Sequence, residues 1–146
     1  TVEAGTLNFY EHAKSLPYEQ FAAAQISFND IRRRVSPFFE KYDAWITPTT
    51  AQVAPPHGIY GMYVDLAPEA FLNHEQRPNQ FLVPYNLTGQ PAISLPLALH
   101  PNGLPIGVQI GARPGEDHVL INLGAALEQA MPWGERLPPV HVSKVN

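Results

Sequence analysis

Apolar residues recur every three or four positions between residues 18 and 42, with charged residues between them. This period is typical of an amphipathic helix whose apolar stripe packs against other elements. Pro37 lies inside the pattern, and because proline lacks a backbone donor and clashes with the preceding turn, we expect a kink or a fresh last turn there. A shorter helix is expected around residues 7–15, so residues 1–43 are predicted to be helical.

Proline dominates the region that follows. Most of the 16 prolines of the chain lie between residues 48 and 114. Residues 44–47 are a short apolar run that ends at Pro48, which is typical of a buried strand that leads into a loop. A long irregular stretch is expected over residues 48–68, with brief helical turns near residues 69–82. Because apolar residues occur throughout, the pattern favours strands and long ordered loops over residues 44–111.

Two runs of alternating apolar residues, 92–99 and 106–110, have the period of two that is expected of strands with one buried face. The dipeptide Asn102-Gly103 between them is a strong turn signal, so the pair is predicted to be a hairpin or two neighbouring strands. Pro96 interrupts the first run, and we expect its missing donor to point away from the strand ladder.

A second amphipathic helix is predicted over residues 115–131, with acidic residues near its amino end and Pro132 beyond its carboxyl end. The tail, residues 132–146, contains apolar residues and prolines without a period, so an extended strap is expected. The length of 146 residues is close to the most common domain size, and residues 1–146 are therefore expected to form one compact unit.

The charge of the chain excludes some functions. Charged residues make up 15% of the chain, below the roughly 25% that is usual for a globular domain, so part of the surface is expected to be buried against something else. The net charge is -4, and the arginines at 32–34 spread around a helix, which argues against nucleic-acid binding. No apolar run approaches the length of a membrane span, and the lack of cysteine fits a cytoplasmic protein.

The chain lacks the patterns that would mark a catalytic or metal site. No two of its six histidines have the spacing that aims two nitrogens at one ion, so no metal site is predicted. None of its five serines lies in a Gly-x-Ser-x-Gly turn, and no lysine is placed to act as the base for a serine. Ser94 is interpreted as an outward or hydrogen-bonded strand residue. Phosphate-loop and dinucleotide fingerprints are absent, so no cofactor is implied.

Four blocks of sequence, in this order, resemble the carboxy-terminal part of amidase-signature enzymes. They are DAWITPTT at 43–50, PPHG at 55–58, PYNLTGQPAISLP at 84–96 and GLPIGVQI at 103–110. The resemblance covers roughly residues 30–139. It implies an α/β fold in which a mixed, twisted sheet is flanked by helices. It also implies amide hydrolysis by a Ser-cisSer-Lys triad that precedes this part of the fold, so no catalytic residue is assigned to this chain.

The resemblance also implies partners and a site. The missing amino-terminal half would cover the apolar faces of this chain, and without it we expect exposed apolar surface to cause self-association into a homo-oligomer. The long loop after Pro48 and the segment from Phe81 through Tyr85 to Asn86 are predicted to form walls of the pocket for a small-molecule amide. Ordinary packing roles for Phe81 and Tyr85 are an equally good interpretation.

Two other functions remain open at the level of sequence. The first is a binding or interaction module that kept the fold without the chemistry. The second is a subunit of a glutamine-dependent amidotransferase, because such subunits share the signature. Complexes of that kind act on charged transfer RNA, and the chain shows no basic surface signal of its own.

Overall fold

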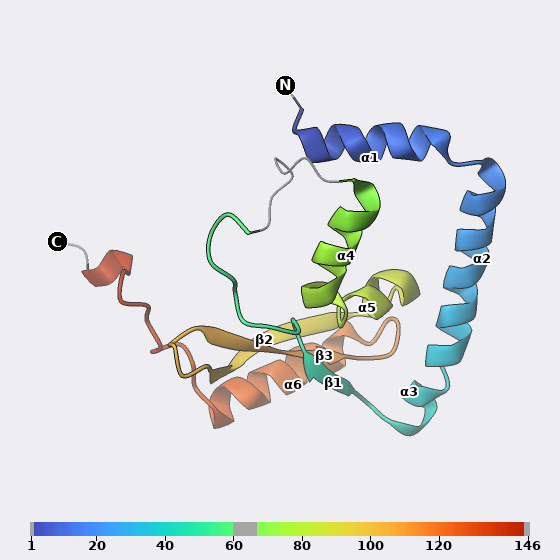
Figure 1. Ribbon diagram of the computed structural model, residues 1–146. Helices are drawn as coiled ribbons and strands as arrows, with labels where there is room; N and C mark the ends of the chain where they lie inside the picture. Colours follow the sequence, from blue (N-terminus) through green and yellow to red (C-terminus); the bar gives the residue numbers. More distant parts are fainter. Residues whose placement is uncertain (1, 60–66, 145–146) are drawn as a thin grey trace.

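A computed structural model describes residues 2–59 and 67–144 (Figure 1). Its elements combine helices with one small sheet, so the expected α/β class with flanking helices is confirmed. The helices are α1 (Ala4–Ser15), α2 (Tyr18–Val35), α3 (Phe38–Lys41), α4 (Pro68–Asn79), α5 (Val83–Thr88) and α6 (Asp117–Ala130), followed by the short 3-10 helix η1 (Val142–Lys144). The strands are β1 (Trp45–Pro48), β2 (Ala92–Leu99) and β3 (Pro105–Gly111).

The three described strands form a sheet in the order β1-β3-β2. Both pairings are antiparallel, whereas the sequence predicted a mixed sheet. The predicted hairpin between β2 and β3 is confirmed. Its turn is closed by a backbone bond from His100 to the carbonyl of Leu104, and Gly103 takes a positive φ of 86° that glycine adopts at little cost. Because β1 pairs with β3, the central strand is the last of the three in sequence.

The register of the hairpin shifts beside Pro96. Leu95 faces Val108, but the next recorded pair is Ala98 with Ile106, so the ladder is irregular between these positions. Proline has no backbone donor for the ladder, and such residues are accommodated at bulges or edges of a sheet. The irregularity therefore lies at the residue that cannot donate to the ladder.

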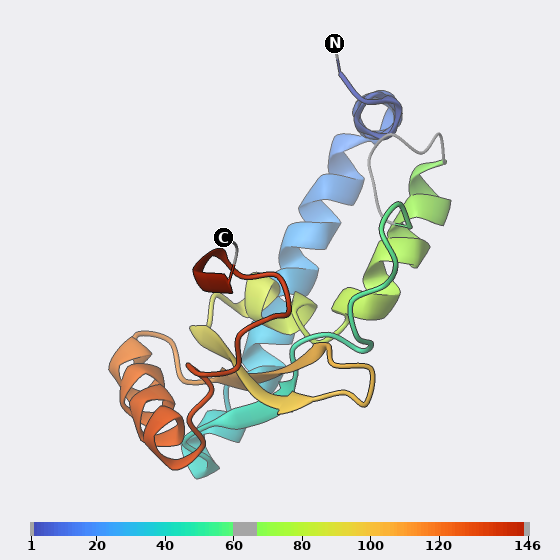
Figure 2. The same ribbon diagram turned by 90° about the vertical axis from the view of Figure 1, so that its left-hand side faces the viewer.

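The core lies between the sheet and α6, which covers one face of the sheet (Figures 1 and 2). Leu95 and Ile110 from the strands pack with Ala112 and with Leu120 of the helix. Residues paired across β2 and β3 point to the same face, which is why the alternating pattern of the sequence produces this layer. The predicted helix over 115–131 is confirmed to within two residues at each end.

The amino-terminal helices stand away from the sheet. Figure 1 shows α1 at the far end of the molecule, with α2 and α4 running between it and the sheet, and Figure 2 shows the same arrangement from the side. Phe9 of α1 meets Phe71 of α4 edge to face at 5.2 Å between ring centroids. The fresh last turn expected at Pro37 is confirmed, because α2 ends at Val35 and α3 begins at Phe38.

Within residues 44–111 the prediction of strands and long loops was wrong in two places. The brief turns expected near 69–82 are one continuous helix, α4, which contains Pro78 in its last turn. The segment from Tyr85 to Asn86, expected to be a loop, lies in α5, where Pro84 occupies the first turn and Gly89 ends the helix with a φ of 73°. Proline is tolerated at the start of a helix because that amide has no partner within it.

Arg32 adds a tertiary contact that sequence alone did not indicate. Its Nε donates to the carbonyl of Thr88 at 3.1 Å, at the carboxyl end of α5, where a cation is favoured by the helix dipole. The arginines at 32–34 are all exposed, and Arg32 combines this exposure with its contact to α5. The tail remains irregular from Met131 to His141 before η1. Over the part of the chain that the structure describes, no helix is long and apolar enough to cross a membrane.

Candidate functional site

An open pocket of about 850 Å³ lies at the end of the sheet that holds the hairpin turn. Three segments form it: the stretch that follows β1, the junction between α4 and α5, and the start of β3 with the end of β2. Its lining residues are Pro48, Thr50, Ala51, Gln52, Val53, Ala54, Pro55, Pro78, Asn79, Gln80, Phe81, His100, Pro105, Ile106 and Gly107. A smaller hollow beside it shares residues 52–55.

Hydrogen bonds tie the three walls of this pocket together. The backbone amide of Thr49 donates to the carbonyl of Gly107 at 2.9 Å and so continues the pairing of β1 with β3. The amide of Ala51 donates to the carbonyl of Pro78 at 2.9 Å and joins the loop to the end of α4. These bonds show that residues 48–51 follow a fixed path along the rim of the pocket.

The predicted site residues occupy three different positions. Phe81 is half-buried and lines the pocket. Tyr85 is buried and does not line the pocket, and Asn86 is exposed on the surface of α5. The three residues are close in sequence, but Phe81 precedes α5, and within that helix the side chains of Tyr85 and Asn86 point in different directions. Of the predicted loop after Pro48, residues 50–55 line the pocket, while Tyr60, Met62 and Tyr63 lie outside the described residues.

Tyr85 lies against the face of the sheet opposite α6. Its ring is 5.8 Å from that of Trp45, and its hydroxyl donates to the carbonyl of Trp45 at 3.4 Å. Gly111 makes this approach possible, because a Cβ there would overlap the Tyr85 ring. Burial raises the pKa of the Tyr85 phenol above its ordinary value of 10.0, while hydrogen bonds with Thr47 and Gln109 act in the opposite direction.

A pair of hydroxyls lies on the same face of the sheet. Ser94 of β2 and Thr49 after β1 are 2.5 Å apart between their side-chain oxygens, which confirms that Ser94 is a hydrogen-bonded strand residue. Gly107 lies between them in the central strand, and a Cβ there would approach Thr49 Oγ1 to 2.7 Å. A glycine is therefore needed at Gly107 to let the two outer segments meet over the central strand.

The side chains that line the pocket suit binding rather than bond cleavage. Among the described residues, they are apolar groups together with hydroxyl, amide and imidazole groups, with no carboxylate, lysine or serine. The Thr50 hydroxyl donates to the carbonyl of Gln52 at 2.8 Å, and His100 Nδ1 accepts from the Asn102 amide at 3.3 Å. The described part of the lining therefore holds no nucleophile paired with a base. Within the described ranges 2–59 and 67–144, no group of three acidic or histidine side chains could hold a metal ion.

Sequence reasoning missed the hairpin side of the pocket. His100, Pro105 and Ile106 line it, although the sequence offers only a turn signal at these positions. They join the pocket because β3 pairs with β1 and not only with β2, and this pairing spans about 60 residues of sequence. No local sequence pattern predicts such a long-range contact.

Comparison with known proteins assigns this chain to a family. A model of the Amidase family matches residues 3–121, and the chain belongs to that family. A relative from Paenarthrobacter ureafaciens named 6-aminohexanoate-cyclic-dimer hydrolase is 33% identical over 142 residues, which are 94% of this chain and 29% of that protein. A protein of Mycobacterium tuberculosis named putative amidase AmiC is 39% identical over 70% of this chain and 21% of its own length.

The fold is also similar to a solved structure. A structure of 6-aminohexanoate cyclic dimer hydrolase superimposes with a TM-score of 0.84 and 34% sequence identity, covering 94% of this chain and 30% of that protein. The chain therefore spans less than a third of the length of these relatives.

Proposed function

We propose that this chain is the carboxy-terminal part of a serine amidohydrolase that cleaves the carbon–nitrogen bond of linear or cyclic amides. In this proposal the Ser-cisSer-Lys triad of the family belongs to the remainder of the enzyme, and the chain supplies the sheet and one wall of the substrate pocket. The match to the cyclic dimer hydrolase, over 94% of this chain at a TM-score of 0.84, is the observation that carries the proposal.

Two features of the structure support this division of labour. The described pocket offers contacts and hydrogen-bonding groups without a nucleophile and its base, as expected of a substrate-binding wall. Apolar residues of α1 and α2 are exposed, among them Leu7, Tyr18 and Phe21, as expected if another part of the enzyme covers them. A cytoplasmic location belongs to the same proposal and is supported by the absence of cysteine.

A hybrid enzyme tests the proposal directly. The matching segment of the Paenarthrobacter hydrolase would be replaced by this chain, and hydrolysis of the 6-aminohexanoate cyclic dimer and of a simple aryl amide would be measured. We expect the hybrid to hydrolyse at least one of these amides. We expect the chain by itself to hydrolyse neither, because the described lining residues of the pocket include no nucleophile with a base.

A matched control is the same hybrid with the triad serine of the hydrolase replaced by alanine, which should remove the activity while leaving the fold intact. A hybrid that folds, as judged by circular dichroism and a cooperative melting transition, yet turns over neither amide would count against the proposal. Sustained turnover by the pure chain alone would show that the division of labour is wrong.

A further inference from the structure

Gln109 is a polar side chain buried in the middle of the sheet. It lies on the central strand β3, is 3% exposed, and is flanked in register by Thr47 on β1 and Ser94 on β2. A buried amide is costly unless its hydrogen-bonding groups are satisfied, so its contacts indicate what the position is used for.

The amide nitrogen of Gln109 reaches out of the sheet to the pocket. Nε2 donates to the backbone carbonyl of Phe81 at 2.9 Å and lies 3.3 Å from Thr47 Oγ1. The first of these bonds joins β3 to the junction between α4 and α5, which is 28 residues away in sequence. The side chain of Gln109 thus holds the backbone of Phe81, which lines the pocket.

The junction is short, and besides Gln109 it is held by the Asn86 amide, which donates to the carbonyl of Leu82 at 3.3 Å, and by the Ala51 bond to Pro78 just before it. It comprises only residues 80–82, between the end of α4 at Asn79 and the start of α5 at Val83. Pro78 and Pro84 flank it, and neither residue can donate a backbone hydrogen bond. Within the junction, the amide of Leu82 donates to the carbonyl of Asn79 at 2.9 Å. The hydrogen bond from Gln109 in the sheet therefore contributes to fixing the position of Phe81.

We infer that Gln109 is a positioning residue for the pocket: its buried amide holds the Phe81 carbonyl and thereby fixes the wall formed by residues 78–81. As far as substrate is concerned, the inference rests on the proposed function. It adds that this wall is held by the sheet and that its position determines how well an amide substrate binds. Loss of the tether raises the KM and leaves the bond-breaking step nearly unchanged, because the reacting groups lie elsewhere in the enzyme.

The first measurement is hydrogen–deuterium exchange of the whole chain, followed by mass spectrometry, in the Gln109→Met variant. Methionine keeps the length of the side chain and removes the amide. We expect exchange of the peptide that spans residues 79–83 to become about tenfold faster, a change that corresponds to the loss of one hydrogen bond of ordinary strength. Gln109→Asn keeps the amide but withdraws it by one methylene, and it should show the same local change if the methionine variant does not fold.

Gln90 provides a matched control. It is also a buried glutamine, 8% exposed, and its Nε2 lies 3.4 Å from the carbonyl of Ala112, away from the pocket lining. Gln90→Met should lower the melting temperature in the same way, without faster exchange of residues 79–83. Equal acceleration of that peptide in both variants, or none in either Gln109 variant, would overturn the inference.

The second measurement uses the hybrid enzyme. With Gln109→Met we expect the KM for the amide to rise about fivefold while kcat stays within about twofold, because ground-state positioning is weakened. A fall in kcat at constant KM would overturn the role in substrate positioning while leaving the proposed function standing. An inactive hybrid with the native Gln109 would contradict the proposed function, and the exchange experiment would still decide whether Gln109 holds the wall.

Discussion

The sheet with α6 and the arm formed by α1 and α2 contain similar apolar residues, but only the first region buries them. Ile110 in the central strand is 1% exposed, whereas Ile26 on α2 is 63% exposed. Helix α2 has 18 residues and none of them is buried. The same side chain therefore has opposite environments in the two regions.

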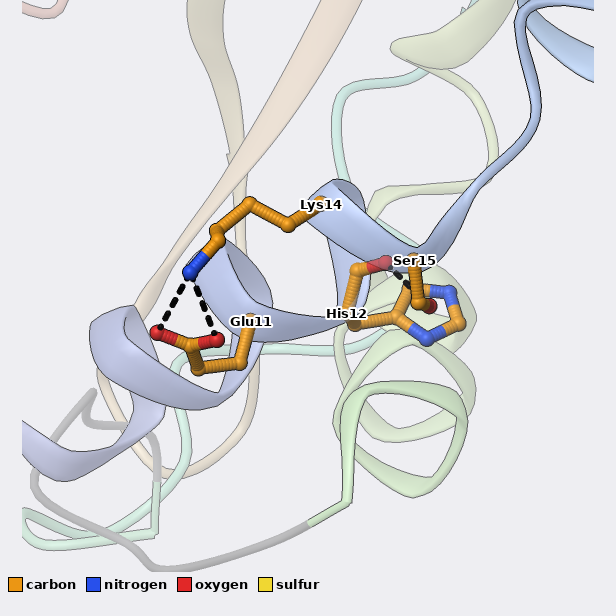
Figure 3. Close-up of polar contacts among 4 residues, drawn as sticks. All are labelled: Glu11, His12, Lys14 and Ser15. Carbon is orange, nitrogen blue, oxygen red and sulfur yellow. Dashed lines mark hydrogen bonds and ion pairs between the residues drawn. The ribbon is translucent and has the colours of Figure 1, made fainter.

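The difference extends to the polar groups. In the sheet they bond across long sequence distances, as Gln109 does with Phe81. On α1 the bonds in Figure 3 are local: Lys14 pairs with Glu11 at 3.1 Å, and the Ser15 hydroxyl donates to the carbonyl of His12 at 2.7 Å. Exposed pairs of this kind contribute little to stability.

Because burial of apolar surface is the main source of folding free energy, the stability of this chain is expected to reside in the sheet and α6. The arm depends on α4, α5 and whatever covers it in a longer protein. The following experiments test this contrast, beginning with the largest expected effect.

Truncation of a core isoleucine should separate the two regions most clearly. Ile110→Ala removes buried methylene groups from the centre of the sheet and should lower the free energy of unfolding by about 3 kcal/mol. The matched change Ile26→Ala removes the same atoms from an exposed position, and its effect should stay within about 0.5 kcal/mol. Urea denaturation of both variants measures the difference, and equal losses would show that the arm is as well packed as the core.

Substitution of Tyr85 tests how strongly α5 packs against the sheet. Tyr85→Phe removes the hydroxyl that bonds to the Trp45 carbonyl and should cost about 1 kcal/mol at neutral pH. The pKa of Tyr85 is raised in the folded state, so the folded protein holds this proton more firmly than the unfolded chain does. Its contribution is therefore complete below the unfolded value of 10.0 and is lost as the pH rises above it.

The measurement is the free energy of unfolding as a function of pH from neutral to alkaline conditions. The decline above about pH 10, the ordinary pKa of tyrosine, should be smaller in Tyr85→Phe than in the native chain. Tyr18→Phe, at a residue that is 76% exposed, is the control and should leave the decline unchanged. Identical alkaline profiles for all three proteins would mean that the Tyr85 phenol is not protected by burial.

The smallest effect on stability is expected in the arm itself. The double variant Phe21→Gln/Ile26→Gln should change the free energy of unfolding by no more than about 1 kcal/mol. It should nevertheless weaken self-association of the isolated chain about tenfold in sedimentation velocity, because exposed apolar residues drive such contacts. Ile121→Gln, at an exposed isoleucine of α6, serves as the control. A chain that is monomeric before any substitution would contradict the predicted homo-oligomer.

The contrast also explains which elements the sequence could predict. The helix α6 and the hairpin of β2 and β3 were predicted because their patterns are local: a helical period between an acidic start and Pro132, and alternation around Asn102-Gly103. The helix α4 was predicted only as brief turns, because its apolar positions are sparse, and it contains Pro78, a residue that is unfavourable inside a helix. Contact of Phe71 with Phe9 on α1 supports this helix, and no local pattern predicts that contact.

The site shows the same limit. Phe81, Tyr85 and Asn86 were grouped because they are neighbours in sequence, yet only Phe81 lines the described pocket. The sequence could not place Tyr85, because its position depends on the lack of a side chain at Gly111, which faces it from the central strand. The sequence likewise could not indicate that Gln109 reaches Phe81.

The sequence by itself determined the family, the local periods of its helices and strands, and the turn that closes the hairpin. The tertiary structure alone decided that β1 joins the far side of β3, that the polar face of the sheet receives α5, and that the pocket has three walls. The physical reason is the range of the interactions. Periods and turns arise from neighbouring residues, whereas strand order and pocket walls arise from contacts between segments that the chain brings together only on folding.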